Sequence, residues 1–138
     1  MKTAYVSFVS LMLFLFVLPS LAQNAVDETE PGFFVLNQYK IPFAKLPDMH
    51  AYQDSIFTPI LDEFVDEGKL LNWGLLTHAW GDEWNYNWFF ITEDHRSFLD
   101  FWDEFFERVD ERFPGWQEDV FPLIDEHKDN MYNISIMR

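Results

Sequence analysis

The sequence has no cysteine and little glycine. None of the 138 residues is cysteine, which excludes disulfides, thiol catalysis and a lipidated N-terminal cysteine. There are five glycines, and no phosphate loop, dinucleotide fingerprint or G-x-S-x-G motif occurs. H-E-x-x-H and EF-hand patterns are also missing. We therefore expect no metal site and no bound cofactor.

Basic residues are scarce as well. Nine Lys and Arg residues stand against 24 Asp and Glu residues, and the net charge is −15. A chain this acidic repels phosphate backbones, so nucleic acid is excluded as a partner. Aromatic residues make up 20% of the sequence, unlike the composition of disordered acidic chains. The length suits one domain with a single core.

The N-terminus carries the pattern of a cleavable secretory signal. Lys2 precedes the apolar run FVSLMLFLFVLP, and the small residues of PSLA come before Gln23. The apolar run is short for a membrane span. We expect residues 1–22 to be removed, residues 23–31 to form a flexible leader and residues 32–138 to form the domain. The protein is then secreted or periplasmic and has no membrane contact after cleavage.

The first half of the domain reads as a strand followed by a helix. Residues 32–41, GFFVLNQYKI, are rich in strand-forming residues. Apolar residues then recur every three or four positions over 49–67, which predicts an amphipathic helix with Asp48 as N-cap and Gly68 at its end. Pro59 lies inside this pattern and predicts a kink or break near Thr58.

The second half begins with a predicted hairpin. Residues 70–80 and 83–92 are strand-like runs separated by Gly81-Asp82, a pair typical of tight turns. A second helix follows, capped by Thr92 or Asp94. Its apolar stripe consists of Phe98, Phe101, Trp102, Phe105 and Val109.

The C-terminal part has weaker signals. FPGW at 113–116 ends the second helix, residues 117–130 are acidic and predict at most a short third helix, and residues 131–137 predict a final strand. The order β-α-β-β-α-β predicts an α+β, ferredoxin-like fold, with a four-stranded antiparallel sheet and helices on one face. The two hairpin strands are apolar on both faces, so we expect a second copy of the chain to cover the other face.

This order and the cadence ILDEFVDEGKLLNWGLLTHAWGDEWNYNWFF (60–90) resemble the dimeric α+β barrel superfamily, which includes antibiotic-biosynthesis monooxygenase-like and NIPSNAP-like proteins. The resemblance covers most of residues 33–137 and rests on topology more than on specific motifs. It implies two sheets packed face to face in a homodimer, and often a pocket between sheet and helices within each subunit. Members include cofactor-free monooxygenases, isomerases and haem-handling enzymes, so the resemblance does not transfer an activity.

A two-residue turn at Gly81-Asp82 would set the faces of the hairpin. His78, Trp80, Asn85 and Asn87 would share one face, because directly opposed residues lie on the same side of a sheet. The opposite, more apolar face would pack against the helices. It would carry Trp73, Leu75, Thr77, Ala79, Trp84, Tyr86, Trp88 and Phe90. A loop one residue longer would reverse this assignment.

Other strands add polar residues to the mixed face of the hairpin, Asn37 and Tyr39 among them. Such a set either lines a wet cavity or forms hydrogen bonds across a dimer interface, since buried polar groups need partners. For a cavity, His78 is the candidate general base or haem ligand, with Tyr39 and Asn87 around the substrate. Trp80, Asn85 and Asn37 are candidate ligand-binding residues. The stretch 125–129, DEHKD, reads as a solvated acidic turn.

Three functions fit these features. The first is a homodimer without catalysis that binds a small apolar or aromatic ligand. The second is a cofactor-free monooxygenase or isomerase. The third is a haem-binding protein that uses one histidine as axial ligand.

Overall fold

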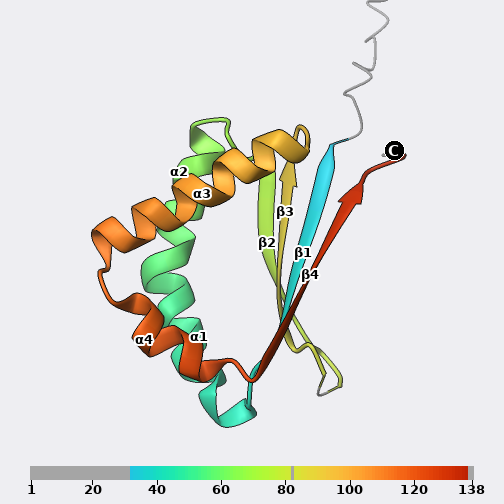
Figure 1. Cartoon of the computed structure of the whole chain (residues 1–138). Helices are drawn as coiled ribbons and strands as arrows, with labels where there is room; N and C mark the ends of the chain where they lie inside the picture. Colours follow the sequence, from blue (N-terminus) through green and yellow to red (C-terminus); the bar gives the residue numbers. More distant parts are fainter. Residues whose placement is uncertain (1–31, 82, 137–138) are drawn as a thin grey trace, which may run out of the picture.

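The computed structural model describes residues 32–81 and 83–136. The predicted signal and leader (1–31), Asp82 of the predicted turn and the last two residues lie outside the described residues. The elements are arranged as a four-stranded sheet with the helices on one face (Figure 1). Among the described residues, no helix is long and apolar enough to cross a membrane.

The sheet has the strand order β2-β3-β1-β4, and every neighbouring pair is antiparallel. Its strands are β1 (Phe33–Lys40), β2 (Asn72–Thr77), β3 (Tyr86–Thr92) and β4 (Glu126–Asn133). The order of strands and helices along the chain confirms the predicted ferredoxin-like α+β fold. The outer strands β2 and β4 are the sheet edges.

One helical run follows β1 after the short turn η1 (Phe43–Lys45). It consists of α1 (Leu46–Tyr52), the π-helical segment η2 (Gln53–Phe57) and α2 (Thr58–Asp66). The predicted Asp48 cap is wrong, because the helix already begins at Leu46, with Pro47 in its first turn. The predicted irregularity near Thr58 is confirmed, since the π segment directly precedes the turn that contains Pro59. Gly68 ends the run with a φ of +72°, a conformation that favours glycine.

The hairpin has the predicted register but a longer loop. Thr77 pairs with Tyr86 and Leu76 with Asn87, as a Gly81-Asp82 turn requires. The ladder nevertheless ends at this pair, so residues 78–85 connect the strands and the prediction of a two-residue turn is wrong. Trp84 has a φ of +49°, which breaks the alternation of side chains expected for a strand.

This break moves the Trp84 side chain to the other face of the sheet. The indole lies against the Lys128 ammonium, 4.2 Å from the ring centroid. Lys128 is opposite Gln38, and Gln38 is opposite Asn87, so all three belong to the face away from Trp88. The prediction that Trp84 shares the apolar face with Trp88 is therefore wrong. Trp73, Leu75, Tyr86, Trp88 and Phe90 do face the helices.

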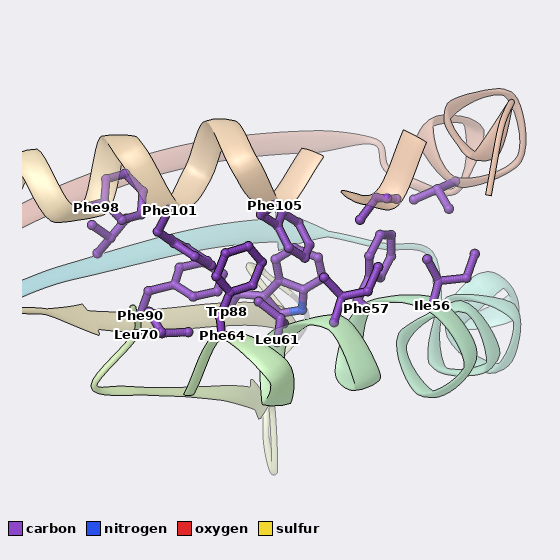
Figure 2. Close-up of a cluster of buried hydrophobic side chains, with 14 of the residues drawn as sticks. Ile56, Phe57, Leu61, Phe64, Leu70, Trp88, Phe90, Phe98, Phe101 and Phe105 are labelled. Carbon is purple, nitrogen blue, oxygen red and sulfur yellow. The ribbon is translucent and has the colours of Figure 1, made fainter. Parts of the chain in front are cut away.

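The core lies between the sheet and helices α2 and α3 (His95–Arg112). Asp94 caps α3 as predicted, and its carboxylate accepts a hydrogen bond of 2.7 Å from the Ser97 N–H. Four buried residues of the predicted stripe face the sheet, whereas Trp102 is half-buried at its border. Figure 2 shows how aromatic rings from the helices meet Trp88 and Phe90. Buried apolar side chains of this kind contribute most of the stability of a small domain.

One buried amide connects the helical run to the sheet. Gln53 of the π segment accepts hydrogen bonds from Trp88 Nε1 at 2.6 Å and from the Tyr86 hydroxyl at 3.3 Å. Its Nε2 donates to Thr58 Oγ1 at 3.1 Å. The π segment thus supplies a polar group that satisfies two buried donors of β3.

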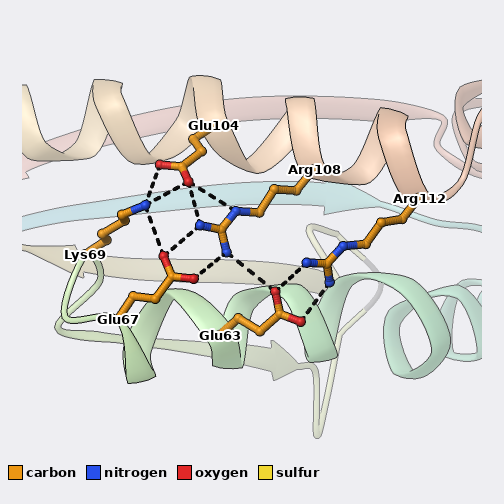
Figure 3. Close-up of polar contacts among 6 residues, drawn as sticks. All are labelled: Glu63, Glu67, Lys69, Glu104, Arg108 and Arg112. Atoms are coloured by element: carbon orange, nitrogen blue, oxygen red, sulfur yellow. Dashed lines mark hydrogen bonds and ion pairs between the residues drawn. The ribbon is translucent and has the colours of Figure 1, made fainter.

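An ion-pair network joins α2 to α3 on the side away from the sheet (Figure 3). It consists of Glu63, Glu67, Lys69, Glu104, Arg108 and Arg112, and each carboxylate has a cationic partner. Arg108 holds Glu67 by two hydrogen bonds of 2.8 and 2.6 Å. These bonds lower the pKa of Glu67 to about 2.

The C-terminal strand begins earlier than predicted. After α4 (Trp116–Val120) and η3 (Phe121–Leu123), β4 starts at Glu126, within the stretch expected to be an acidic turn. It pairs with β1 from Lys40–Glu126 to Phe33–Asn133. Residues 126–130 have no strand pattern of their own, and the pairing partner determines their conformation. His127 and Asp129 therefore lie on a sheet instead of in a solvated turn.

Candidate functional site

A pocket of about 410 Å³ lies between the β1–β4 edge of the sheet, α3 and η3. This size is within the usual range for sites of small molecules. A smaller hollow of about 60 Å³ adjoins it, with Tyr39, Phe106, Phe121 and Ile124 in both linings. The apolar lining of the larger pocket consists of Tyr39, Trp102, Phe106, Phe121 and Ile124.

The aromatic walls of the pocket are held by ring contacts. Trp102 meets Phe106 edge to face, with 4.8 Å between the ring centroids. Phe106 stacks on Trp116 at 5.8 Å, and Phe121 contacts the edge of Trp116 at 5.4 Å. These contacts join α3, α4 and η3, so the walls are positioned by packing before any ligand arrives.

The polar part of the lining comes from β1 and β4. Asn37 and Asp129 are directly opposed on these strands, and both line the pocket. The Asn37 side chain is buried, with 2% of its surface exposed. Its Oδ1 has no hydrogen-bond partner in the described part of the chain. A buried acceptor without a partner is costly, so this oxygen is a recognition group for a ligand that carries a donor.

Tyr39 keeps a protonated phenol in this site and can donate a hydrogen bond. Burial raises the pKa of its phenol well above the ordinary value, the neighbouring Asn37 amide opposes the shift, and the negative charge of Asp129 adds to it. The hydroxyl therefore keeps its proton at neutral pH. His127 stacks on the Tyr39 ring, with 6.4 Å between the centroids. Tyr39 is thus suited to orient a polar ligand atom and unsuited to remove a proton.

Carboxylates surround the polar part of the pocket, and Asp125, Glu126 and Asp129 form what we call its acidic edge. Two of them have cationic neighbours: Lys40 Nζ is 3.0 Å from Glu126, and Lys45 Nζ is 3.9 Å from Asp125. No ion pair with Asp129 occurs within residues 32–81 and 83–136. The same residues contain no group of three or more His, Asp or Glu side chains able to hold a metal ion.

The structure separates the residues predicted to act together. Tyr39 and Asn37 were expected on the mixed face of the sheet, but Asn37 pairs with Trp88 and both face the helices. Asn87 pairs with Gln38 and lies on the opposite face. His78 is exposed in the loop, with its imidazole beside Gly81, and so is neither in the sheet nor in the pocket. His78, Tyr39 and Asn87 therefore do not meet in one site.

The remaining predicted ligand-binding residues also have other positions. Trp80 is 95% exposed in the loop and lies outside the pocket lining. Asn85 is buried and tied to the backbone: its Oδ1 accepts from the Ile41 N–H at 2.9 Å, and its Nδ2 donates to the Ile41 carbonyl at 2.8 Å. Asn85 thus holds the backbone that follows β1 next to the start of β3. Of the three predicted ligand-binding residues, Asn37 alone lines the pocket.

Sequence reasoning missed several pocket residues for identifiable reasons. Trp102 belongs to the apolar stripe of α3 and reads as core. His127 and Asp129 lie in a charged stretch without a strand pattern, and only the pairing with β1 brings them to Asn37 and Tyr39. The alternation of Asn37 and Tyr39 on a predicted strand, toward the same face as Val35, was the one available signal.

The outer face of the sheet, directed away from the helices, carries a second apolar surface. Phe34 stacks on Phe89 with 6.0 Å between centroids and contacts Tyr132 at the same distance. Leu76 is 50% exposed there. Asn87 donates from Nδ2 to the Trp84 carbonyl at 2.7 Å, but its buried Oδ1 has no partner in the described residues. The apolar members of this face are Phe34, Leu36, Leu76, Phe89, Ile91 and Tyr132.

Comparison with models of known families finds no match, and no curated protein matches the sequence. Solved structures do match. A NIPSNAP family protein from Agrobacterium tumefaciens aligns with a TM-score of 0.60 and 13% identity, over 73% of this chain and 90% of that one. A dimeric ferredoxin-like protein from an uncultured marine organism aligns with a TM-score of 0.59 and 12% identity, over 80% and 92%.

A conserved protein from Methanosarcina mazei Go1 has the same fold, with a TM-score of 0.56 and 12% identity over 76% of this chain and 94% of that one. Identities at this level show a shared fold and no more. The fold implied by the resemblance to the dimeric α+β barrel superfamily is confirmed, and a NIPSNAP family protein and a dimeric ferredoxin-like protein share it.

Proposed function

We propose that this protein binds a small aromatic or apolar molecule in the pocket between β1, β4 and α3. The observation that carries the proposal is the combination of preformed aromatic walls with the buried Oδ1 of Asn37, which has no partner among residues 32–81 and 83–136. The walls supply apolar contact area, and the amide supplies one directional contact. Few polar groups in a mostly apolar pocket are the usual composition of a small-molecule site.

The two alternative functions have less support from this pocket. The predicted base His78 lies outside the pocket lining, and proton abstraction by Tyr39 in its place is opposed by the raised pKa of the phenol. For the haem alternative, the axial ligand from this pocket would have to be His127. Its imidazole is already stacked on the Tyr39 ring. The cofactor-free monooxygenase or isomerase and the haem-binding protein therefore remain predictions, with less support than ligand binding.

Ligand binding can be tested with three compounds of nearly equal shape: propylbenzene, 2-phenylethylammonium and 3-phenylpropanoate. At ligand efficiencies usual for such small molecules, we expect a dissociation constant between about 10 µM and 1 mM for at least one of them. Titration calorimetry or ligand-observed NMR would measure it. Saturable binding by none of the three would contradict the proposal.

A matched pair of variants locates the binding. Phe121 is 58% exposed at the pocket, and Phe43 is 66% exposed outside its lining. We expect Phe121→Ala to weaken binding of the best probe about fivefold or more, since one aromatic wall is lost. Phe43→Ala should leave the affinity unchanged. Equal effects of both substitutions would place the binding elsewhere.

We also propose that two copies of the chain form a homodimer through the outer face. That face exposes a row of aromatic and aliphatic side chains across four strands, and contiguous apolar surfaces of this kind mark interaction sites. A structural neighbour is described as dimeric. The Oδ1 of Asn87 on this face has no partner among the described residues, and a second copy of the chain packed there can supply a donor.

The test of the dimer uses two leucines of equal exposure. Leu76 lies on the outer face, whereas Leu71, 51% exposed, lies on the helix side near Gly68 and Phe101. In sedimentation velocity at micromolar concentration, Leu76→Lys should sediment as a monomer, because it buries a charge in the interface. Leu71→Lys should remain a dimer. A monomeric wild type would refute this part of the proposal.

Secretion is proposed on the pattern of residues 1–22. Expression of the full chain in a secreting host should release a protein whose first residue is near Gln23, as measured by N-terminal sequencing. Retention of Met1 in the recovered protein would contradict a cleavable signal.

A further inference from the structure

We infer that the molecule bound in this pocket is an organic ammonium ion, with a positively charged N–H group joined to an aromatic or apolar body. This inference rests on the proposed ligand-binding function and names the chemical class of its ligand. Its basis is the juxtaposition of Asn37, Asp129 and the aromatic walls in one pocket.

The two acceptors of the site belong to one cross-strand pair. Asn37 and Asp129 are directly opposed on neighbouring antiparallel strands and point to the same side of the sheet. Side chains at such positions have Cβ atoms about 4.5–5.5 Å apart. An ammonium nitrogen between them can donate one N–H to the Asn37 Oδ1 and another to the Asp129 carboxylate. The buried oxygen then has the partner that residues 32–81 and 83–136 do not supply.

The charges around the pocket favour a cation over a neutral or anionic ligand. Two of the three carboxylates of the acidic edge are offset by lysines, Glu126 by Lys40 at 3.0 Å and Asp125 by Lys45 at 3.9 Å. Asp129 has no ion pair within the described residues, so its charge is the uncompensated one. Lys128, although next to Asp129 in sequence, points to the other face and lies against Trp84. An anion would meet uncompensated negative charge, and a neutral hydrocarbon would leave the Asn37 oxygen unpaired.

The walls suit the same ligand class. Tyr39, Trp102, Phe106 and Phe121 line the same pocket as the two acceptors. Aromatic faces attract cations through their quadrupole, and they also accept the apolar body of the ligand. Tyr39 keeps its proton, so its ring adds no charge of its own. Apolar walls next to paired acceptors thus match a molecule with an ammonium group at one end.

The three probes named above separate this inference from the proposed function. We expect 2-phenylethylammonium to bind at least tenfold more tightly than propylbenzene and 3-phenylpropanoate. We also expect its affinity to fall as salt is raised from 20 to about 300 mM, because added ions screen the attraction. If propylbenzene or 3-phenylpropanoate binds as tightly as the ammonium ion, the cation inference fails and ligand binding stands. If none of the three binds, both proposals fail.

A charge-matched pair of variants assigns the preference to Asp129. Asp129→Asn should weaken binding of 2-phenylethylammonium at least fivefold and leave propylbenzene unchanged, whereas Asp66→Asn, an exposed position on α2 outside the pocket lining, should change neither. Both substitutions alter the net charge equally, so a general charge effect would appear in both. Equal affinities in the two variants would overturn the assignment. Circular dichroism spectra and melting curves show that each variant is folded before its affinity is compared.

Discussion

The two halves of the sheet, β2–β3 and β1–β4, differ in how their buried polar groups are satisfied. Near β2, β3 and α2, Gln53 and Asn85 have partners within the chain: Gln53 receives two donors of β3, and Asn85 pairs with both backbone groups of Ile41. The Oδ1 of Asn87, on the outer face of the sheet, is the exception among the described residues. Near β1 and β4, Asn37 has a buried oxygen without a partner and Asp129 has no ion pair among the described residues.

This contrast indicates which polar groups serve the fold. A buried hydrogen bond that is complete inside the chain stabilises the native state, whereas an incomplete one costs free energy and persists only where something else compensates. The paired side therefore reads as scaffold and the unpaired side as a recognition site. Three substitutions test the contrast, from the largest expected effect to the smallest.

Asn85→Leu should have the largest effect. It removes both hydrogen bonds to Ile41, whose backbone N–H and carbonyl are then buried without partners. We expect the free energy of unfolding to fall by about 3 kcal/mol. Urea denaturation followed by tryptophan fluorescence would measure it. A loss below about 1 kcal/mol would show that this amide is not a scaffold element.

Glu67→Gln should have a smaller effect that depends on pH. The Arg108 guanidinium lowers the pKa of Glu67 from 4.5 to about 2 in the folded protein. The carboxylate thus stabilises the fold fully above pH 4.5, and this contribution disappears as the pH falls through 2. We expect the variant to melt a few degrees below the wild type at pH 7, and the two melting temperatures to converge toward pH 2.

The control for Glu67 is Glu107→Gln. Glu107 is exposed on α3 and has no ion pair within the described residues. Its melting temperature should follow that of the wild type across the same pH range. If the melting temperatures of Glu67→Gln and the wild type differ by the same amount from pH 7 to pH 2, the ion pairs of Glu67 do not stabilise the fold.

Asn37→Leu should have the smallest effect on stability and the opposite sign. The substitution replaces a buried amide, whose oxygen has no partner among the described residues, by an apolar group of similar size beside an open pocket. We expect the free energy of unfolding to stay unchanged or to rise by up to about 1 kcal/mol. A loss comparable to that of Asn85→Leu would mean that Asn37 is hydrogen-bonded in solution and would remove the contrast between the two sides.

Much of the fold followed from local patterns. The helical spacing of Phe98, Phe101 and Phe105 predicted α3, and Asp94 was among its expected caps. The Gly81-Asp82 pair predicted the register of the hairpin correctly, although the loop is longer because Trp84 adopts a positive φ. Periodicity and turn residues act over a few positions, so they are readable without the tertiary structure.

The candidate site was less accessible. Of six predicted site residues, Asn37 and Tyr39 line the pocket, and His78, Trp80, Asn85 and Asn87 do not. The tryptophan and histidine residues of the hairpin favoured it as the predicted site, but its loop leaves the sheet after Thr77. Side chains beyond that point no longer follow strand alternation, and their positions depend on the loop conformation.

The sequence by itself determined the class of the fold, the amphipathic helices, the hairpin register and the excess of negative charge, because each depends on composition or on neighbours a few residues apart. Only the tertiary structure decided where that charge acts. The stretch 125–129 has no strand signal, and its pairing with β1 places Asp129 opposite Asn37 and His127 beside Tyr39. Long-range strand pairing is set by the packing of the whole sheet, so the pocket appears only once the chain is folded.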